Sequence, residues 1–420
     1  MISLIEALRF RCLRAISQEM GDFHVLVGPN GSGKTTLLDV ISFLGRLVSD
    51  GIDAAIEERS SNFYDLLWQR TGSSFELAIE LDIPEELRDR IQREPLNVVR
   101  YQVRLAIDEE SNQVVLDAET VLLMERHATL NPPQISLFPR PQTEPETILE
   151  KIGSPSVKTV INKSAGGNDN FYSETYGEKG KGWVPAFKLG PRRSALSNLP
   201  EDESRFPVAT WLKETLTGGV QKLVLNSLLI RQASPPGRAR AFQPDGSNLP
   251  WVIHDLERRQ PGKIGEWIEH LRTALPDLEG VRTVERPDDR HRYLMLTYEG
   301  GLEVPSWMAS DGTLRLLALT LPAYLPEIGG NHLIEEPENG IHPRAGETMY
   351  QSLSSVYGAQ ILLATHSPVI FSLVDPEALL CFAKDPEGAT DIVLGSEHPA
   401  LQAWRGRVNL ATLHAAGVLG

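Results

Sequence analysis

A glycine-rich segment, GPNGSGKT at 28–35, constrains the fold of this 420-residue chain more than any other. The mostly apolar residues FHVLV at 23–27 come directly before it and predict a buried strand. Leucine and isoleucine at 37, 38, 41 and 44 follow it at helical spacing. A segment of the form GxxxxGK[ST] between a strand and a helix surrounds phosphate oxygens with backbone N–H groups and the helix N-terminus. The sequence therefore predicts an α/β core with a phosphate site at this turn.

The side chains of this segment indicate which phosphate compound binds. Lys34 is expected to reach β- and γ-phosphates, and the Thr35 hydroxyl is expected to ligate Mg²⁺. ATP with Mg²⁺ is therefore the predicted ligand. The residues predicted to bind ATP are Gly28, Pro29, Asn30, Gly31, Ser32, Gly33, Lys34, Thr35 and Thr36.

A strand that ends in closely spaced glutamates is the second unusual feature. In HLIEEPENGIHP at 332–343, Glu335 and Glu336 follow two apolar residues, and Glu338 comes two places later. Carboxylates this close repel one another, so they indicate a cation or a reaction that needs them. Beside a Mg-ATP site, Glu335 is expected to hold Mg²⁺ through water, and Glu336 to orient or deprotonate the attacking water. Taken alone, the segment is equally consistent with a solvated acidic turn.

Two further segments carry candidate site residues. ILLATHSPVIF at 361–371 predicts a buried strand, and His366 at its end could hydrogen-bond a γ-phosphate or the attacking water. In WMASDGTLRLLALTL at 307–321, Ser310, Asp311 and Gly312 open an apolar-faced helix, with serine or aspartate available as its cap. The alternatives are a structural histidine and an ordinary capped helix.

Taken in order, these segments resemble the motifs of ABC-type ATPases of the RecF/SMC/OLD class. GPNGSGKTT resembles Walker A, SDGTLR that class's variant of the ABC signature, LIEEPENGIHP the Walker B, catalytic glutamate and D-loop, and ATHSP the H-loop. LRFRCLRAIS near the start resembles the opening strand of these proteins. The resemblance covers about 1–85 and 300–420, and it is specific as a set although each motif alone is not.

The resemblance implies a fold and a mechanism. The fold would be an α/β P-loop NTPase of the ABC/RecF head type, with an antiparallel β subdomain and an inserted mixed helical lid. Two subunits would form a C2 homodimer around two ATP molecules. Ser310, Asp311 and Gly312 of one subunit would then act in trans on the γ-phosphate bound by the other, and His366 would sense that phosphate.

Three features differ from the family pattern. Glu335 stands where Walker B usually has aspartate, one methylene shorter. The Q-loop glutamine is not obvious, and Gln69 in LLWQRTG is a candidate. Nothing that resembles the TOPRIM nuclease domain of OLD proteins follows the H-loop. We expect three regions: an N-terminal ATPase lobe at 1–125, an inserted lid at 126–300 that is mostly helical from about 206 to 275, and a C-terminal ATPase lobe at 301–420.

The composition opposes several classes of protein. The net charge of −15 opposes a surface that grips nucleic acid throughout, because affinity for phosphate chains comes from clustered lysine and arginine. Two cysteines without metal-ligand spacing oppose a disulfide scaffold or zinc site and favour a reducing cytoplasm. No apolar run is long enough to span a membrane, and no signal peptide is evident.

Three functions remain open. The ATPase could drive a separately encoded effector, such as a TOPRIM-like nuclease, in prokaryotic anti-phage defence, with the tail VNLATLHAAGVLG docking that partner or covering the core. It could be a RecF-like DNA-repair clamp, or an ATP-gated scaffold with slow turnover. The arginines that could contact DNA are Arg192, Arg193, Arg231, Arg238, Arg240, Arg286, Arg290 and Arg292.

Overall fold

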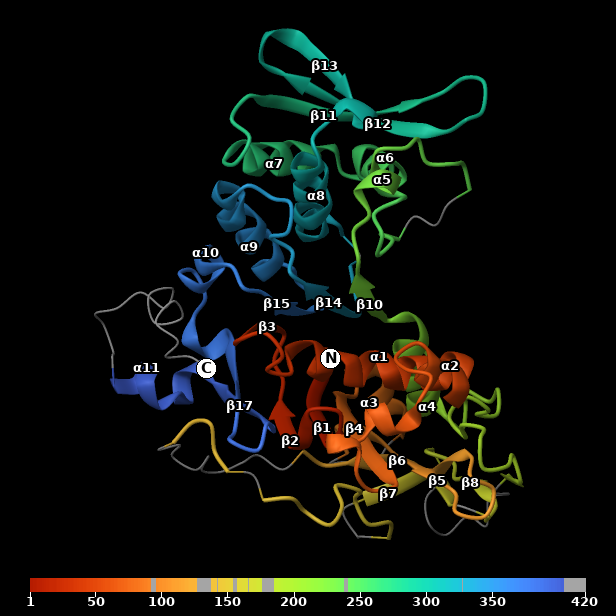
Figure 1. The fold of residues 1–420 in the computed structure, drawn as a ribbon. Coiled ribbons are helices and arrows are strands. Elements are labelled where there is room, and N and C mark those ends of the chain that lie inside the picture. Colours follow the sequence, from red (N-terminus) through yellow and green to blue (C-terminus); the bar gives the residue numbers. More distant parts are fainter. Residues whose placement is uncertain are drawn as a thin grey trace.

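Eight strands from the first half of the chain form one antiparallel sheet, in the order β2-β1-β4-β5-β6-β7-β8-β9 (Figure 1). The computed structural model describes residues 1–91, 96–126, 137–141, 143–153, 157–164, 166–175, 185–237, 241–326 and 328–403. The strands of this sheet are β1 (Ile2–Phe10), β2 (Leu13–Glu19), β4 (Ser74–Asp82), β5 (Val98–Ile107), β6 (Val114–Met124), β7 (Val157–Ser164), β8 (Asp169–Phe171) and β9 (Ala186–Phe187).

A six-stranded sheet, in the order β10-β14-β15-β3-β16-β17, carries the predicted site at its carboxyl edge. Its strands run parallel except β17, which forms an antiparallel hairpin with β16. Both faces of the sheet are covered, which explains why its central strands are almost continuously apolar. The strands are β3 (Phe23–Val27), β10 (Val220–Leu223), β14 (Asn331–Glu335), β15 (Gln360–Ala364), β16 (Leu379–Lys384) and β17 (Thr390–Leu394).

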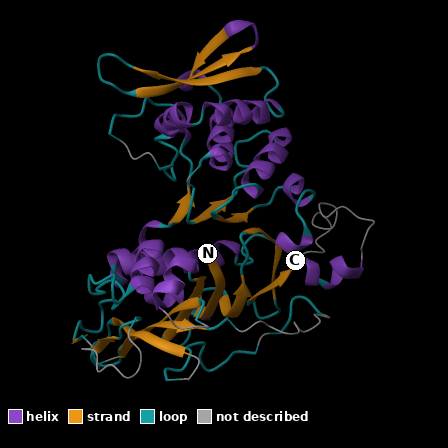
Figure 2. Cartoon of the chain, turned by 180° about the vertical axis from the view of Figure 1, so that it is seen from behind, coloured by secondary structure: helices purple, strands orange, loops and turns teal. Residues whose placement is uncertain are grey.

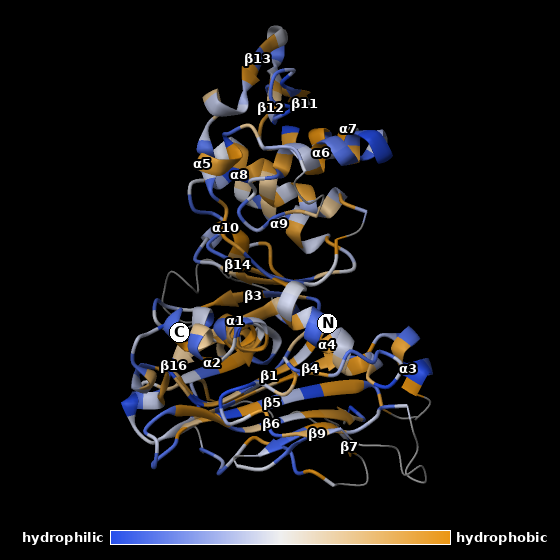
Figure 3. Ribbon diagram, turned by 90° about the vertical axis from the view of Figure 1, so that its right-hand side faces the viewer, coloured by the Kyte–Doolittle hydropathy of each residue, from blue (hydrophilic) through white to orange (hydrophobic). Residues whose placement is uncertain are grey.

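Helix α1 (Lys34–Asp50) lies between the two sheets, with α2 (Ile52–Glu57) and α4 (Pro207–Gly218) beside it (Figures 1 and 3). Its buried leucine, isoleucine, valine and phenylalanine side chains join residues of both sheets in one hydrophobic core. Leu362 of β15 points into this core, whereas Leu363 points into a second core on the opposite face. The helix that begins at the glycine-rich turn is therefore fixed on two sides.

The second core joins the parallel sheet to a layer of helices, which a small three-stranded sheet covers (Figures 1 and 2). The Trp267 indole donates to the buried Thr320 hydroxyl at 2.9 Å within this layer. Its elements are α5 (Ser227–Ile230), α6 (Leu249–Arg259), α7 (Pro261–Arg272), β11 (Leu278–Glu285), β12 (Arg292–Tyr298), β13 (Leu302–Pro305), α8 (Asp311–Thr320), α9 (Gly346–Ser354) and α10 (Pro368–Phe371). Two outlying helices are α3 (Glu85–Ile91) and α11 (Pro399–Ala403).

The α/β class and the antiparallel β subdomain are confirmed. Within the region expected to be mostly helical from about 206 to 275, residues 220–223 instead form β10 at the edge of the parallel sheet. A short apolar run fits a buried strand as well as a helix, so periodicity could not separate the two. The three-region division remains a prediction; strands from the 126–300 range belong to all three sheets.

Candidate active site

The glycine-rich turn has a backbone that only glycine tolerates at two points. Gly28 has φ +148° and Gly33 has φ +107°, a region that residues with a side chain rarely adopt. A Cβ at position 28 would lie 2.3 Å from the Phe382 carbonyl oxygen, and one at position 33 would lie 2.4 Å from Thr390 Oγ1. The turn is therefore packed tightly against β16 and β17 from outside, while its inner side remains a cradle for a ligand.

Lys34 lies across this turn. Its Nζ donates to the carbonyl oxygens of Gly28 at 2.7 Å and Pro29 at 3.0 Å, and the residue is 7% exposed. Burial lowers the pKa of Lys34 to about 8, although the nearby Glu336 acts in the opposite direction. The amino group is thus a desolvated cation, and it has carbonyl partners that an anionic ligand can replace.

The carboxyl ends of three parallel strands bring the predicted residues together. The segments after β3, β14 and β15 meet at one pocket of about 270 Å³. The Thr35 hydroxyl donates to Glu335 Oε2 at 3.0 Å across this pocket. The lining residues are Arg11, Asn30, Gly31, Ser32, Gly33, Lys34, Thr35, Thr36, Glu335, Glu336, Ala364 and His366.

Glu336 adopts a strained backbone conformation with φ +46°. Its N–H donates to the Ala364 carbonyl at 2.7 Å, and the Asn339 side-chain amide donates to Glu336 Oε2 at 2.5 Å. These two contacts hold the carboxylate beside the pocket.

Glu338 does not line the pocket and instead joins two segments of the site. Its Oε1 accepts hydrogen bonds from the Thr365 hydroxyl at 2.7 Å and from the His366 N–H at 2.8 Å. Glu338 therefore ties the glutamate segment to the histidine segment.

His366 lies beside the same pocket. Burial and the Lys34 charge lower its pKa, while Glu336 and Glu338 act to raise it. The imidazole is therefore mainly neutral near pH 7, with one nitrogen that donates and one that accepts. That state suits hydrogen bonding to a phosphate oxygen or to a water molecule.

Comparison with known families supports the assignment that this geometry suggests. A family model described as "AAA domain, putative AbiEii toxin, Type IV TA system" matches residues 23–372. The chain belongs to this AAA-domain family. No curated protein sequence matches the chain.

One solved structure shows that this AAA protein shares the fold of an Smc head. The structure of an Smc head bound to the C-winged helix domain of ScpA has a TM-score of 0.53 at 14% identity and covers 93% of this chain and 97% of that chain. An Smc head with an extended coiled coil, bound to the C-terminal domain of ScpA and derived from Pyrococcus furiosus, gives 0.49 at 13% identity, covering 96% and 98%. The Thermotoga maritima SMC head gives 0.43 at 10%, covering 94% and 98%. The AAA protein therefore combines the AAA-domain family assignment with the fold of an Smc head.

The signature-like segment lies at the start of α8 and is not among the pocket-lining residues. Ser310 caps the helix by accepting from the Thr313 N–H at 3.1 Å. Asp311 accepts two hydrogen bonds from Arg231, at 2.6 and 3.0 Å. Both Ser310 and Asp311 are exposed. Their side chains are therefore accessible to another molecule but do not complete the pocket of their own chain.

Gly312 links this segment to the glutamate loop. A Cβ at Gly312 would lie 2.7 Å from the Gly340 carbonyl oxygen. Gly312→Ala is therefore expected to lower the free energy of unfolding by about 1–3 kcal/mol, because the loop must move. Gly265→Ala, in α7, meets no atom within 4 Å and is expected to stabilise by about 0.5–1 kcal/mol. Urea unfolding of both variants measures the difference, and a Gly312→Ala variant as stable as Gly265→Ala contradicts the packing argument.

Gln69, the Q-loop candidate, contacts the turn between β16 and β17. It is exposed, and its side-chain amide donates to the Glu387 carbonyl at 3.3 Å. Gln69 is not among the pocket-lining residues. Its assignment as the Q-loop residue stays a prediction.

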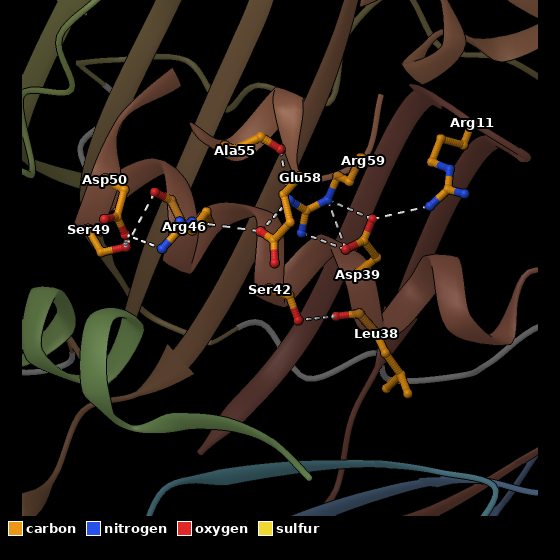
Figure 4. A network of polar contacts seen from close by, with 10 residues as sticks. All are labelled: Arg11, Leu38, Asp39, Ser42, Arg46, Ser49, Asp50, Ala55, Glu58 and Arg59. Carbon is orange, nitrogen blue, oxygen red and sulfur yellow. Dashed lines mark hydrogen bonds and ion pairs between the residues drawn. The ribbon is translucent and has the colours of Figure 1, made fainter. Parts of the chain in front are cut away.

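Two cations near the site were not among the predicted site residues. Arg11 lines the pocket, and Asp39 on α1 accepts its hydrogen bond at 3.2 Å while also pairing with Arg59 at 2.6 Å (Figure 4). Lys222 of β10 lies 2.8 Å from Glu335 Oε1. Arg11 comes from a turn after the first strand, and Lys222 lies in a segment expected to be helical. Lys222 approaches the site because β10 pairs with β14 at the edge of the parallel sheet.

The low pKa of Lys34 predicts a pH dependence of ATP binding. Bound phosphates favour the charged amine, so binding above about pH 8 should take up a proton. The pKa of Lys34 is about 8 in the free protein and should rise when phosphates bind. The affinity for ATP should therefore stay nearly constant well below pH 8 and fall as the pH rises above it. Calorimetry at about pH 8.5 in two buffers of different ionisation enthalpy should show uptake of most of one proton. Lys34→Arg, which stays charged, should show almost none, and negligible uptake by the wild type would refute the assignment.

Proposed function

We propose that this protein binds Mg-ATP in the pocket beside the glycine-rich turn and hydrolyses it. One observation carries the proposal: Lys34, Thr35, Glu335, Glu336 and His366 come from three separate segments and converge on one pocket. A lysine for the phosphates, a hydroxyl and a carboxylate for Mg²⁺, and a residue that positions water are the groups that P-loop enzymes use for phosphoryl transfer.

The described residues fit a nucleotide with its metal. The Ser32 hydroxyl is buried beside the pocket and has no hydrogen-bond partner among the described residues, so it could donate a hydrogen bond to a phosphate oxygen. Thr35 Oγ1 and Glu335 Oε2 already point toward each other and would hold Mg²⁺, directly or through water. The bound ion would supply charge that stabilises the phosphate oxygens in the transition state. Lys34 would exchange its carbonyl partners for phosphate oxygens.

Glu336 is the proposed general base. Its backbone strain and the Asn339 hydrogen bond hold one carboxylate oxygen, which leaves the other to orient or deprotonate a water molecule. His366, mainly neutral near pH 7, would hydrogen-bond the terminal phosphate or that water. In this arrangement the protein positions charge and water and forms no covalent bond to the phosphate.

The proposal includes a homodimer with two-fold symmetry. Ser310 and Asp311 are exposed and stand apart from the pocket of their own chain, as expected if they face the ATP of a second copy. Arg231 partly neutralises Asp311, which would otherwise repel a phosphate. Ser310, Asp311 and Gly312 would thus complete the site of the partner subunit.

Phosphate release from ATP tests the proposed activity. Purified protein should release phosphate with Mg²⁺ and lose that activity in EDTA. The rate per chain should rise with protein concentration until dimers saturate. A rate that does not depend on Mg²⁺ would contradict the proposed chemistry.

We further propose that the ATPase drives a separately encoded effector in prokaryotic defence, for which a TOPRIM-like nuclease is one candidate. The family description, which names a putative AbiEii toxin and a type IV toxin–antitoxin system, supports this setting. Co-purification with the product of a neighbouring gene, strengthened by ATP, tests it. Isolation of the protein without such a product, with ATP and without, would argue against it.

A DNA clamp receives less support from the side chains. Arg292 is buried and pairs with Glu285 at 2.6 Å, and Arg231 pairs with Asp311. Arg192 pairs with an aspartate of α2. Groups engaged in this way are poor candidates for phosphate contacts, and hydrolysis that DNA stimulates with steep salt dependence would reverse this preference.

The tail 408–420, considered as a docking segment, lies outside the described residues, as do Arg238 and Arg240. No helix among the described residues is long and apolar enough to cross a membrane.

A further inference from the structure

Lys222 contacts the carboxylate proposed to hold the metal. Strands β10 and β14 are parallel and pair Lys222 with Leu333. Because side chains alternate along a strand, Lys222 points to the same face as Leu333 and as Glu335, two residues further on. The four-carbon stem of lysine spans the remaining step, and Nζ lies 2.8 Å from Glu335 Oε1. The contact therefore follows from the strand register.

The two oxygens of Glu335 face different groups: Oε1 makes an ion pair but accepts no hydrogen bond among the described residues, and Oε2 accepts one. Lys222 lies at Oε1, and the Thr35 hydroxyl donates to Oε2 at 3.0 Å. The carboxylate is thus held between the edge strand and the first residues of α1. Glutamate has one more rotatable bond than the aspartate of the family pattern, so two-sided contact limits an orientation that would otherwise vary.

The Lys222–Glu335 pair is partly open to solvent, with 47% of the lysine side chain and 24% of the glutamate side chain exposed. A pair with this exposure is weak and can rearrange when a stronger cation arrives. Arg315, another cation beside this part of the site, donates instead to the carbonyl oxygens of Asn339 and Leu225. Lys222 is therefore the positive charge placed to offset Glu335.

We propose that Lys222 is a positioning residue and the resident counter-ion of Glu335. It orients the carboxylate toward Thr35 and offsets its charge, so that a nucleotide without metal is not strongly repelled. This inference rests on the proposed function, because it takes Glu335 as a metal ligand. Without Lys222, the unpaired Glu335 would repel metal-free nucleotide, and Mg²⁺ would relieve the repulsion.

Calorimetric titration with the non-hydrolysable analogue AMP-PNP tests this inference. The measured quantity is the ratio of the dissociation constant in EDTA to that in Mg²⁺. Lys222→Met should raise this ratio about three- to fivefold relative to the wild type, mainly because binding in EDTA weakens. Lys222→Arg keeps the charge and should stay within about twofold. Lys263→Met removes a lysine of similar exposure, paired with Glu266 on α7, and should change nothing.

Glu335→Gln in the same titration distinguishes failure of the Lys222 role from failure of the proposed Mg²⁺ site at Glu335. If Glu335→Gln lowers the ratio while Lys222→Met leaves it unchanged, the role of Lys222 is overturned and the metal site stands. If Glu335→Gln also leaves the ratio unchanged, the metal assignment itself fails. A raised ratio in Lys222→Met, restored in Lys222→Arg, supports the inference, because a purely structural role would not alter the dependence on Mg²⁺.

Discussion

Lys34→Ala is expected to weaken ATP binding by about 10²- to 10³-fold. Lys34 is the buried cation across the glycine-rich turn, and its removal takes away a desolvated charge partner of the phosphates. Truncating one member of such a pair costs about 2–5 kcal/mol. Calorimetric titration with Mg-ATP measures the loss.

The matched control for this change is Lys263→Ala, which removes an exposed lysine of α7. It should bind Mg-ATP as the wild type does. Lys34→Ala should also remain folded, because the lysine makes hydrogen bonds only to carbonyl oxygens that solvent or the backbone can satisfy. A folded Lys34→Ala protein that binds Mg-ATP with wild-type affinity would rule out the pocket as the nucleotide site.

Glu336→Gln is expected to slow hydrolysis by about 10²- to 10⁴-fold, because the amide cannot take a proton from water. ATP affinity should change little, since glutamine has the same shape and Glu336 is placed by its backbone and by Asn339. Uncleaved ATP would then hold two copies together. Light scattering with Mg-ATP should therefore show accumulation of a dimer.

Glu347→Gln on α9 controls for loss of a carboxylate, since this residue is exposed and away from the pocket. It should hydrolyse ATP at the wild-type rate. Normal turnover in Glu336→Gln would show that another group activates the water. Slow turnover without dimer accumulation would retain the catalytic role and remove the support for ATP-driven closure.

The sequence predicted the turn, its flanking strand and helix, and the three strand-end residues Glu335, Glu336 and His366. These predictions depend on local chemistry, because a glycine-rich turn needs its glycines and a strand that ends in carboxylates needs a cation. The pocket brings all of these groups together. The groups meet because the parallel strands β3, β14 and β15 end at one edge of the sheet.

Contacts between segments far apart in the chain could not be predicted from the sequence. Residues 220–223 are too short for their period to distinguish strand from helix, so β10 and the Lys222–Glu335 contact were missed. Arg11 reaches the pocket through a turn whose direction depends on packing against α1. The close approach of Gly312 to the Gly340 carbonyl oxygen likewise depends on how two separate segments pack together.

Mixing two inactive variants tests most directly whether two copies share each ATP site. Lys34→Ala removes the nucleotide-binding lysine but keeps Ser310, and Ser310→Arg blocks the signature-like segment but keeps the pocket. Each protein alone should be inactive. Random pairing of equal amounts makes half the dimers mixed, each with one complete site, so about a quarter of the wild-type rate should return. A mixture as inactive as its components would contradict the shared site.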